Sequence, residues 1–175
     1  MRAPFEEMKR EFERVLRNRG FSPERAARCA AIFAENSLVG VASHGLNRFP
    51  GFIEFVERGL VKPEVEAELV SSFGAWEQWD GNLGPGPLNA YQCTEQAMTL
   101  ARQHGVGCVG LRNTNHWMRG GYFGWQAAQA GFALIAWTNT KPNAPAWGGL
   151  DPRIGNNPLV LAVPNDATPV VLDMA

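Results

Sequence analysis

The spacing of hydrophobic residues changes near Pro63, and this change constrains the fold more than any other feature of the chain. Before it, apolar residues such as Met8 and Phe12 recur at intervals of three and four, which is typical of amphipathic helices. After it, short apolar runs alternate with glycine- and proline-rich turns. We therefore expect an α/β protein with a helical N-terminal region, residues 1–62, followed by a mixed α/β domain, residues 63–175.

Local signals predict three helices in the N-terminal region. The first ends at Gly20, because glycine adopts the left-handed conformation that closes a helix. The second begins at Ser22, which is followed by a proline and an acid, as is common at a helix N-terminus. A third helix is expected to follow Ser43 and to run to Gly59, with Pro50 bending or restarting it.

The remaining chain reads as strands, two helices and one long loop. The expected helices are LNAYQCTEQAMTLARQHG and GGYFGWQAAQAG, and VGCVGLRN is expected to be a buried strand. The other expected strands are AELVSSF, WEQWD, FALIAWTN, LVLAVP and TPVVLDMA. The segment TKPNAPAWGGLDPRIGNNP is long for a loop, so we expect the region from Trp137 through this segment to be functional. Two flanking strands and the tryptophans Trp137 and Trp147 argue against disorder.

The segment from Gly105 to Gly110 spells G-x-G-x-x-G, which is the dinucleotide-binding fingerprint of Rossmann folds. In that fold the glycines leave a strand and open a helix, so that the pyrophosphate meets the helix N–H groups. Here an expected helix precedes the glycines and an expected strand follows them. We therefore interpret Gly105 as a helix C-cap and reject the Rossmann fold.

Composition excludes several classes of function. The formal net charge is -1, so a nucleic-acid partner is not expected, and no apolar run is long enough to cross a membrane. The N-terminus carries acids and lacks an apolar signal core, which indicates a cytoplasmic protein. Cys29, Cys93 and Cys108 are widely spaced and are expected to be buried thiols, and the spacing of the three histidines predicts no metal site.

The stretch SHGLNR, residues 43–48, is the first candidate for chemistry. On a helix, His44 and Arg48 would share one face because they are four residues apart. An imidazole with an ordinary pKa near ~6.5 can donate a proton, and a guanidinium can hold a carboxylate through two parallel bonds. The pair therefore suits reduction of a 2-keto acid, whereas the alternative is that Ser43 caps a helix and the other two side chains are solvated.

The stretch RNTNHWMRGGYFG, residues 112–124, is the second candidate. Gly120 and Gly121 open an expected helix, where free N–H groups attract anions and the missing side chains let a phosphate approach. His116 follows an expected strand at its carboxyl end, where α/β proteins commonly bind ligands. The alternative is a tight turn, in which Asn115 is a cap and His116 is bonded to the backbone.

Several motifs together resemble one enzyme family. They are SHGLNRFPGFIE, EQWDG, GLRNTNHWMRGGYFGWQAA, WTNT, PAWGG, RIGNNPLVLAVP and VVLDMA. This set resembles the type-2 malate/L-lactate dehydrogenases, which use NAD(P) without a Rossmann fold, and the resemblance extends from the first helix to the end of the chain. It implies that a hydride passes from the nicotinamide to the carbonyl carbon while a histidine protonates the oxygen.

The resemblance assigns roles to individual residues. His44 corresponds to the proton donor, Ser43 to its neighbour in a relay, and Arg48 to the clamp for the substrate carboxylate. His116 and Asn156 are expected to contact substrate, although many relatives carry threonine at position 156. The expected cofactor-binding residues are His116, Trp117, Met118, Arg119, Gly120, Gly121, Asp173, Met174 and Ala175.

The resemblance also predicts the wider context. The cofactor is expected to be NADH, with NADPH possible, and the substrate a 2-keto sugar acid or another small acid such as malate, lactate or ureidoglycolate. Family members continue well beyond residue 175 and form homodimers, so the chain resembles an N-terminal portion. A non-catalytic alternative is a shortened relative that acts only by pairing with a full-length subunit.

Overall fold

The computed structural model describes residues 3–174, and the chain forms two compact units. The first unit ends at Arg119 and the second begins at Gly120. Both contain helices and strands, which confirms the expected mixed α/β class. The helical N-terminal region was expected to end at residue 62, and the structure changes there from helices alone to helices and strands. That residue 62 is a domain boundary stays a prediction.

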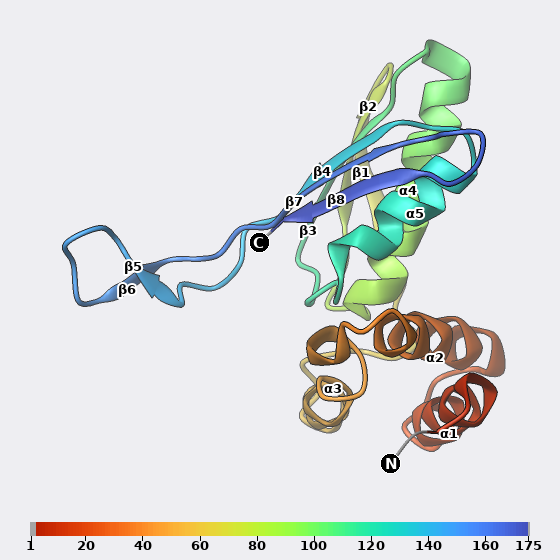
Figure 1. Ribbon diagram of the computed structural model, residues 1–175, viewed down its shortest axis with the longest axis vertical. Coiled ribbons are helices and arrows are strands. Elements are labelled where there is room, and N and C mark those ends of the chain that lie inside the picture. Colours follow the sequence, from red (N-terminus) through yellow and green to blue (C-terminus); the bar gives the residue numbers. More distant parts are fainter. Residues whose placement is uncertain (1–2, 175) are drawn as a thin grey trace. The chain divides into compact units, whose positions relative to one another are not determined.

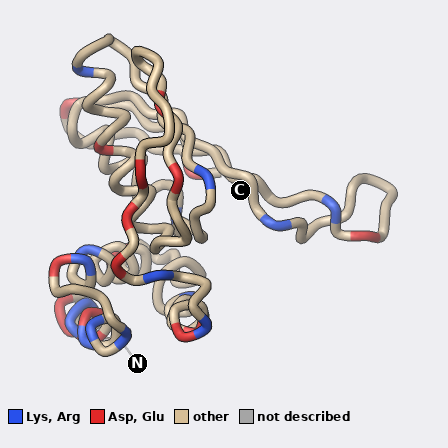
Figure 2. The backbone as a smooth tube through the Cα atoms, turned by 180° about the vertical axis from the view of Figure 1, so that it is seen from behind, with Lys and Arg blue, Asp and Glu red and all other residues tan. Residues whose placement is uncertain are grey.

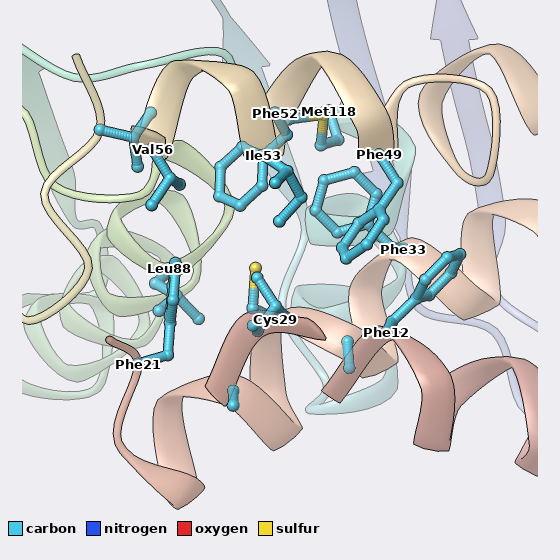
Figure 3. Close-up of a cluster of buried hydrophobic side chains, with 14 of the residues drawn as sticks. Phe12, Phe21, Cys29, Phe33, Phe49, Phe52, Ile53, Val56, Leu88 and Met118 are labelled. Carbon is cyan, nitrogen blue, oxygen red and sulfur yellow. The ribbon is translucent and has the colours of Figure 1, made fainter. Parts of the chain in front are cut away.

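The first unit opens with a helical layer. It consists of α1 (Phe5–Arg17), α2 (Pro23–Leu38), the short 3-10 helix η1 (Ala42–His44) and α3 (Phe49–Glu57), as Figure 1 shows. Their apolar faces form one aromatic core, in which the ring centroids of Phe33 and Phe49 lie 5.0 Å apart at a nearly perpendicular angle (Figure 3). Figure 2 shows acidic and basic residues interspersed along these helices.

The expected third helix is broken, so an uninterrupted helix from Ser43 to Gly59 is wrong, whereas the alternative that the helix restarts at Pro50 is confirmed. The backbone of Gly45 takes φ -115 and ψ -118, which no α-helix accommodates, and α3 starts only at Phe49. Pro50 sits in the first turn of α3, where its missing N–H costs nothing. Residues 45–48 are therefore a turn between η1 and α3.

A three-stranded sheet completes the first unit. Strand β1 (Glu68–Phe73) pairs antiparallel with β2 (Trp76–Asp80), which pairs in parallel with β3 (Cys108–Arg112). Helix α4 (Gly86–His104) links β2 to β3 and packs against β3. It ends at Gly105 with φ 80, which confirms the C-cap interpretation.

Two expectations about β3 are corrected. The strand is half-buried with alternating exposure, because only one of its faces lies against a helix, so the prediction of a buried strand is wrong. Cys108 lies on the open face and is exposed, whereas Cys29 and Cys93 are buried as expected.

The second unit is a helix packed on a second sheet. Strands β4 (Leu134–Trp137), β7 (Leu159–Val163) and β8 (Val170–Met174) are antiparallel in the order β4-β7-β8. Helix α5 (Gly120–Gln129) covers one face, and a Cβ at Gly124 would lie 3.1 Å from Val160 and Val171. Glycine at position 124 therefore lets α5 approach the sheet closely.

The other face of this sheet is apolar and exposed. Ile135, Leu161 and Leu172 are neighbours across the three strands, and all three are exposed. The same face carries Trp137, Val163, Val170 and Met174, which are exposed as well. Exposed apolar area of this kind commonly marks an interaction surface.

The expected loop between β4 and β7 contains a small hairpin of β5 (Ala144–Pro145) and β6 (Pro152–Ile154), which Figure 1 shows as an arm. Trp147 and Leu150 near its tip are 104% and 97% exposed. Trp147 serves in the sequence as an argument against disorder, but its side chain is fully exposed, so the regular structure of this segment comes from the pairing of β5 with β6.

Candidate active site

The turn that carries Ser43, His44 and Arg48 is held by the end of α2. The fully buried Asn36 donates from Nδ2 to the His44 carbonyl at 3.1 Å, and the Leu46 N–H donates to Ser37 Oγ at 2.8 Å. These two side chains satisfy backbone groups that the break between η1 and α3 leaves without helical partners. Neither Asn36 nor Ser37 was singled out from the sequence, because a positioning role depends on which loop packs beside them.

Gly45 is required by the same packing. A Cβ at this position would overlap Ser37 Oγ and would lie 2.8 Å from the Ser37 nitrogen and 2.9 Å from the Phe33 carbonyl oxygen. Since real Cβ atoms do not approach backbone atoms so closely, only glycine fits without a shift of the turn. The glycine of the SHG motif is therefore explained by its contact with α2.

Ser43 and His44 form a hydrogen-bonded pair. Ser43 Oγ lies 3.0 Å from His44 Nδ1, and the His44 side chain is partly buried while Ser43 is exposed. This bond occupies Nδ1 of the His44 ring. The expectation that His44 and Arg48 share one helical face is wrong, because the turn at Gly45 separates them.

His116 lies beside this pair. Its ring centroid is 5.5 Å from that of His44, although the two histidines come from different elements and distant parts of the sequence. Part of its side chain remains exposed. Partial desolvation, and after it the positive charges of Arg48 and His44, lower the pKa of His116 to about 4. His44, Arg48 and His116, which sequence reasoning proposed separately, are therefore brought into one neighbourhood.

The backbone around His116 is tightly fixed. The Met118 N–H donates to His116 Nδ1 at 2.9 Å, and Asn115 Nδ2 lies within hydrogen-bond distance of the carbonyls of Leu60, Leu83 and Gly84. Met118 has a positive φ of 68, a conformation that costs a non-glycine residue about 1–3 kcal/mol. Its side chain lies in the aromatic core, which holds this geometry in place (Figure 3). The alternative in which His116 is bonded to the backbone is therefore confirmed, whereas Asn115 bonds to distant carbonyls and not as the expected cap.

The N-terminus of α5 holds one of the chain's own carboxylates. The Gly121 N–H donates to Asp173 Oδ2 at 3.0 Å, and a Cβ at Gly121 would lie 2.5 Å from the same oxygen. The expectation that this N–H is free for a phosphate is therefore wrong. In this arrangement the Asp173 carboxylate accepts from the Gly121 N–H, and a cofactor contact at Gly121 stays a prediction.

The remaining predicted residues lie in three places. Asn156 is exposed and accepts from Thr140 Oγ1 at 2.9 Å, while the Thr140 N–H donates to Asn157 Oδ1 at 2.9 Å. These bonds close the base of the β5–β6 hairpin. Trp117, Arg119 and Gly120 follow His116 directly, and Met174 is the last residue of β8. Ala175 lies outside the described residues.

Comparison with known proteins decides the family. A profile of the family described as malate/L-lactate dehydrogenase matches residues 3–175. The chain belongs to the malate/L-lactate dehydrogenase family. The interpretation based on the sequence motifs is therefore confirmed at the level of the family.

Named relatives and solved structures of this family refine the comparison. The chain is 49% identical over 172 residues to the 2,3-diketo-L-gulonate reductase of Mannheimia succiniciproducens, covering 98% of this chain and 51% of the relative. The 2,3-diketo-L-gulonate reductase of Escherichia fergusonii is 46% identical, with the same coverage. The chain thus spans about half the length of the curated relatives it matches.

Solved structures show the same fold. The malate dehydrogenase of Pyrococcus horikoshii matches with a TM-score of 0.95 and 32% identity, covering 100% of this chain and 50% of that one. The sulfolactate dehydrogenase of Methanocaldococcus jannaschii matches with a TM-score of 0.94 and 34% identity, covering 100% and 51%. Among the described residues, no helix is long and apolar enough to span a membrane.

Proposed function

We propose that the protein takes part in the NAD(P)H-dependent reduction of a 2-keto sugar acid, with 2,3-diketo-L-gulonate reduced to 3-keto-L-gulonate. The observation that carries this proposal is the neighbourhood of His44, Arg48 and His116, with the His44 and His116 rings 5.5 Å apart. The substrate assignment is supported by two reductases of that name at 49% and 46% identity. Reduced NAD, or NADP, would supply the hydride.

In this proposal His44 donates the proton. The protonated ring keeps Nδ1–H bonded to Ser43 Oγ, 3.0 Å away, and presents Nε2–H to the carbonyl oxygen of the substrate. The carbonyl π bond breaks as a C–H bond forms at carbon and an O–H bond forms at oxygen. Arg48, which is exposed, holds the substrate carboxylate through two parallel hydrogen bonds.

Contacts to the cofactor are part of the same proposal. In the first unit, His116, Trp117, Met118 and Arg119 are proposed to contact it, and Trp117 and Arg119 are partly exposed, which suits a ring and a charged group. In the second unit, Gly120, Gly121, Asp173 and Met174 are proposed contacts. Because the Gly121 N–H is bonded to Asp173, a contact there would involve a hydrogen-bond donor of the nucleotide and not a phosphate.

The test is NADH oxidation by the purified chain with 2,3-diketo-L-gulonate, compared with 2-keto acids related to malate, lactate and ureidoglycolate. The proposal predicts the highest kcat/KM with diketogulonate. Faster turnover of one of the other acids would keep the reaction class and overturn the sugar-acid assignment. Replacing NADH by NADPH in the same assay decides between the two cofactors.

A second candidate function is pairing with a full-length relative without independent catalysis. It is favoured by the exposed apolar face of the β4-β7-β8 sheet, on which Ile135 and Trp137 are each 68% exposed. Co-expression with the Mannheimia reductase followed by size-exclusion chromatography tests it. Co-elution together with no turnover by the chain alone supports pairing, and separate peaks overturn it.

A further inference from the structure

We infer that Asn36 is a positioning residue for His44, and that its side-chain amide fixes the direction of the His44 ring by holding the turn that carries it. This inference rests on the proposed function, because it assumes that His44 acts on the substrate. Asn36 lies on α2 and reaches His44 through the backbone carbonyl and not through the ring. Its effect on the reaction therefore passes through His44.

Asn36 binds both ends of the short helix η1. Its backbone carbonyl accepts from the Val41 N–H at 2.9 Å, directly before η1. Its side-chain Nδ2 donates to the His44 carbonyl at 3.1 Å, at the last residue of η1. The bond from the His44 N–H to the Val41 carbonyl, at 3.0 Å, is internal to the turn and does not tie it to α2. Asn36 thus attaches the turn to α2 on either side of Ser43.

The contact with His44 requires an amide nitrogen at position 36. The His44 carbonyl is an acceptor, so the N–H side of the Asn36 amide must face it. The other side, Oδ1, is buried and has no hydrogen-bond partner among the residues that the structure describes. A buried polar atom without a partner is destabilising, and Asn36 is 0% exposed, so an apolar side chain would suit the core better. The asparagine is therefore explained by its bond to His44 and not by the stability of the core.

The bond should affect the proton donor more than the substrate clamp. Ser43 Oγ, 3.0 Å from His44 Nδ1, belongs to the same turn, so both side chains would move if the His44 peptide rotated. Arg48 lies beyond Gly45 at the start of α3, which anchors it separately. Misplacement of a reacting group by ~1 Å can reduce the rate by about 10²-fold. Loss of the Asn36 amide should therefore lower kcat and leave KM nearly unchanged.

The kinetic test compares Asn36→Leu with a matched control, Thr94→Val. Leucine fills a similar volume without an N–H donor. Thr94 is also buried, but its hydroxyl bonds to the Ala90 carbonyl within α4, so valine there removes a polar group away from the turn.

With 2,3-diketo-L-gulonate, we expect kcat of Asn36→Leu to fall by about 10- to 100-fold and KM to stay within about threefold, and Thr94→Val to change neither. An unchanged kcat would overturn the inference. A KM that rises as much as kcat falls would overturn it too, since that result marks a general loosening of the turn that includes Arg48.

Asn36→Asp provides a rescue that a merely structural role would not produce. A protonated carboxyl can donate to the His44 carbonyl as the amide does, whereas a carboxylate cannot. Burial should raise the pKa of the introduced carboxyl, so that it is protonated at pH ~5. We expect Asn36→Asp to have a higher kcat than Asn36→Leu at this pH, each relative to wild type. Equal losses in the two variants would overturn the inference.

Nitrogen NMR of the chain labelled at its three histidines follows the His44 ring without turnover, and His44→Gln assigns its signals. We expect these signals to shift in Asn36→Leu and to stay in place in Thr94→Val. Unshifted signals in Asn36→Leu would overturn the inference, whether or not the chain alone is active. If His44→Ala retains turnover, the proposed function falls, while shifted signals still support the positioning of the ring by Asn36. If His44→Ala loses turnover and Asn36→Leu does not, the inference alone is overturned.

Discussion

Replacing Gly45 by alanine should destabilise the first unit by about 2–4 kcal/mol. The added methyl group would overlap Ser37 Oγ and would lie 2.8 Å and 2.9 Å from the Ser37 nitrogen and the Phe33 oxygen, both of which are backbone atoms of α2. Overpacking of this kind costs about 1–3 kcal/mol. Moving the turn away would also break the bond from the Leu46 N–H to Ser37 Oγ, which contributes about 1 kcal/mol.

Gly51→Ala is the matched control. Gly51 lies in α3 with no atom within 4 Å of the added methyl group, so alanine there should stabilise the helix by about 0.5–1 kcal/mol. Urea unfolding followed by far-ultraviolet circular dichroism compares the two variants through their midpoints at constant slope. The first unit contains α1 to α4 and the short η1, whereas the second unit contains α5, so the first unit dominates this signal.

A double variant locates the obstruction. Removing the hydroxyl in Ser37→Ala should restore only part of the stability lost in Gly45→Ala, because the two backbone atoms remain in place. If Gly45→Ala were as stable as Gly51→Ala, the turn that carries His44 would not be packed on α2, and the positioning argument would be refuted. Full recovery in the double variant would attribute the whole cost to the hydroxyl.

Three further predictions concern the core, the thiols and the second unit. Phe33→Ala should cost about 3–5 kcal/mol in urea unfolding, since Phe33 is fully buried among aromatic rings, and a loss under 1 kcal/mol would contradict the packing. A thiol reagent at neutral pH should modify Cys108 alone in the folded chain, because burial raises the pKa of Cys29, and that of Cys93 to about 12. The pKa of Cys93 is higher in the folded chain than its ordinary value, so the folded chain should lose stability as the pH rises from about 9 toward 12. This pH-dependent loss of stability should be smaller in Cys93→Ala. Asp173→Ala should lower the stability of α5 by about 0.5–2 kcal/mol, because it removes the acceptor of the Gly121 N–H. Hydrogen exchange of the α5 amides measures this loss, with Asp166→Ala as a surface control. Unchanged exchange in Asp173→Ala would show that Asp173 does not cap α5.

The regular elements follow closely from local sequence. Helix α4 ends at Gly105 and α5 begins at Gly120, as glycine placement and the 3.6-residue period predict. The strands β1, β2, β4, β7 and β8 also fall within the expected segments. These features depend on neighbouring residues only, so one sequence is sufficient to predict them.

Features that depend on tertiary contacts were not predictable in the same way. The break at Gly45 follows from its contact with Ser37 on α2, which no helical period reveals. Asp173 reaches the N-terminus of α5 from 52 residues away and takes the N–H expected to bind a phosphate. The approach of His44 to His116 likewise required the fold, although the resemblance had named both residues.

The measurement that tests the central claim most directly is the turnover of His44→Ala with NADH and 2,3-diketo-L-gulonate, together with the Kd for NADH from fluorescence. If His44 donates the proton, kcat should fall by roughly 10²–10⁴, since a positioned acid contributes that much. The Kd for NADH should stay close to that of the wild type, because the ring acts on the substrate oxygen. A variant that retains near-wild-type turnover would contradict the account.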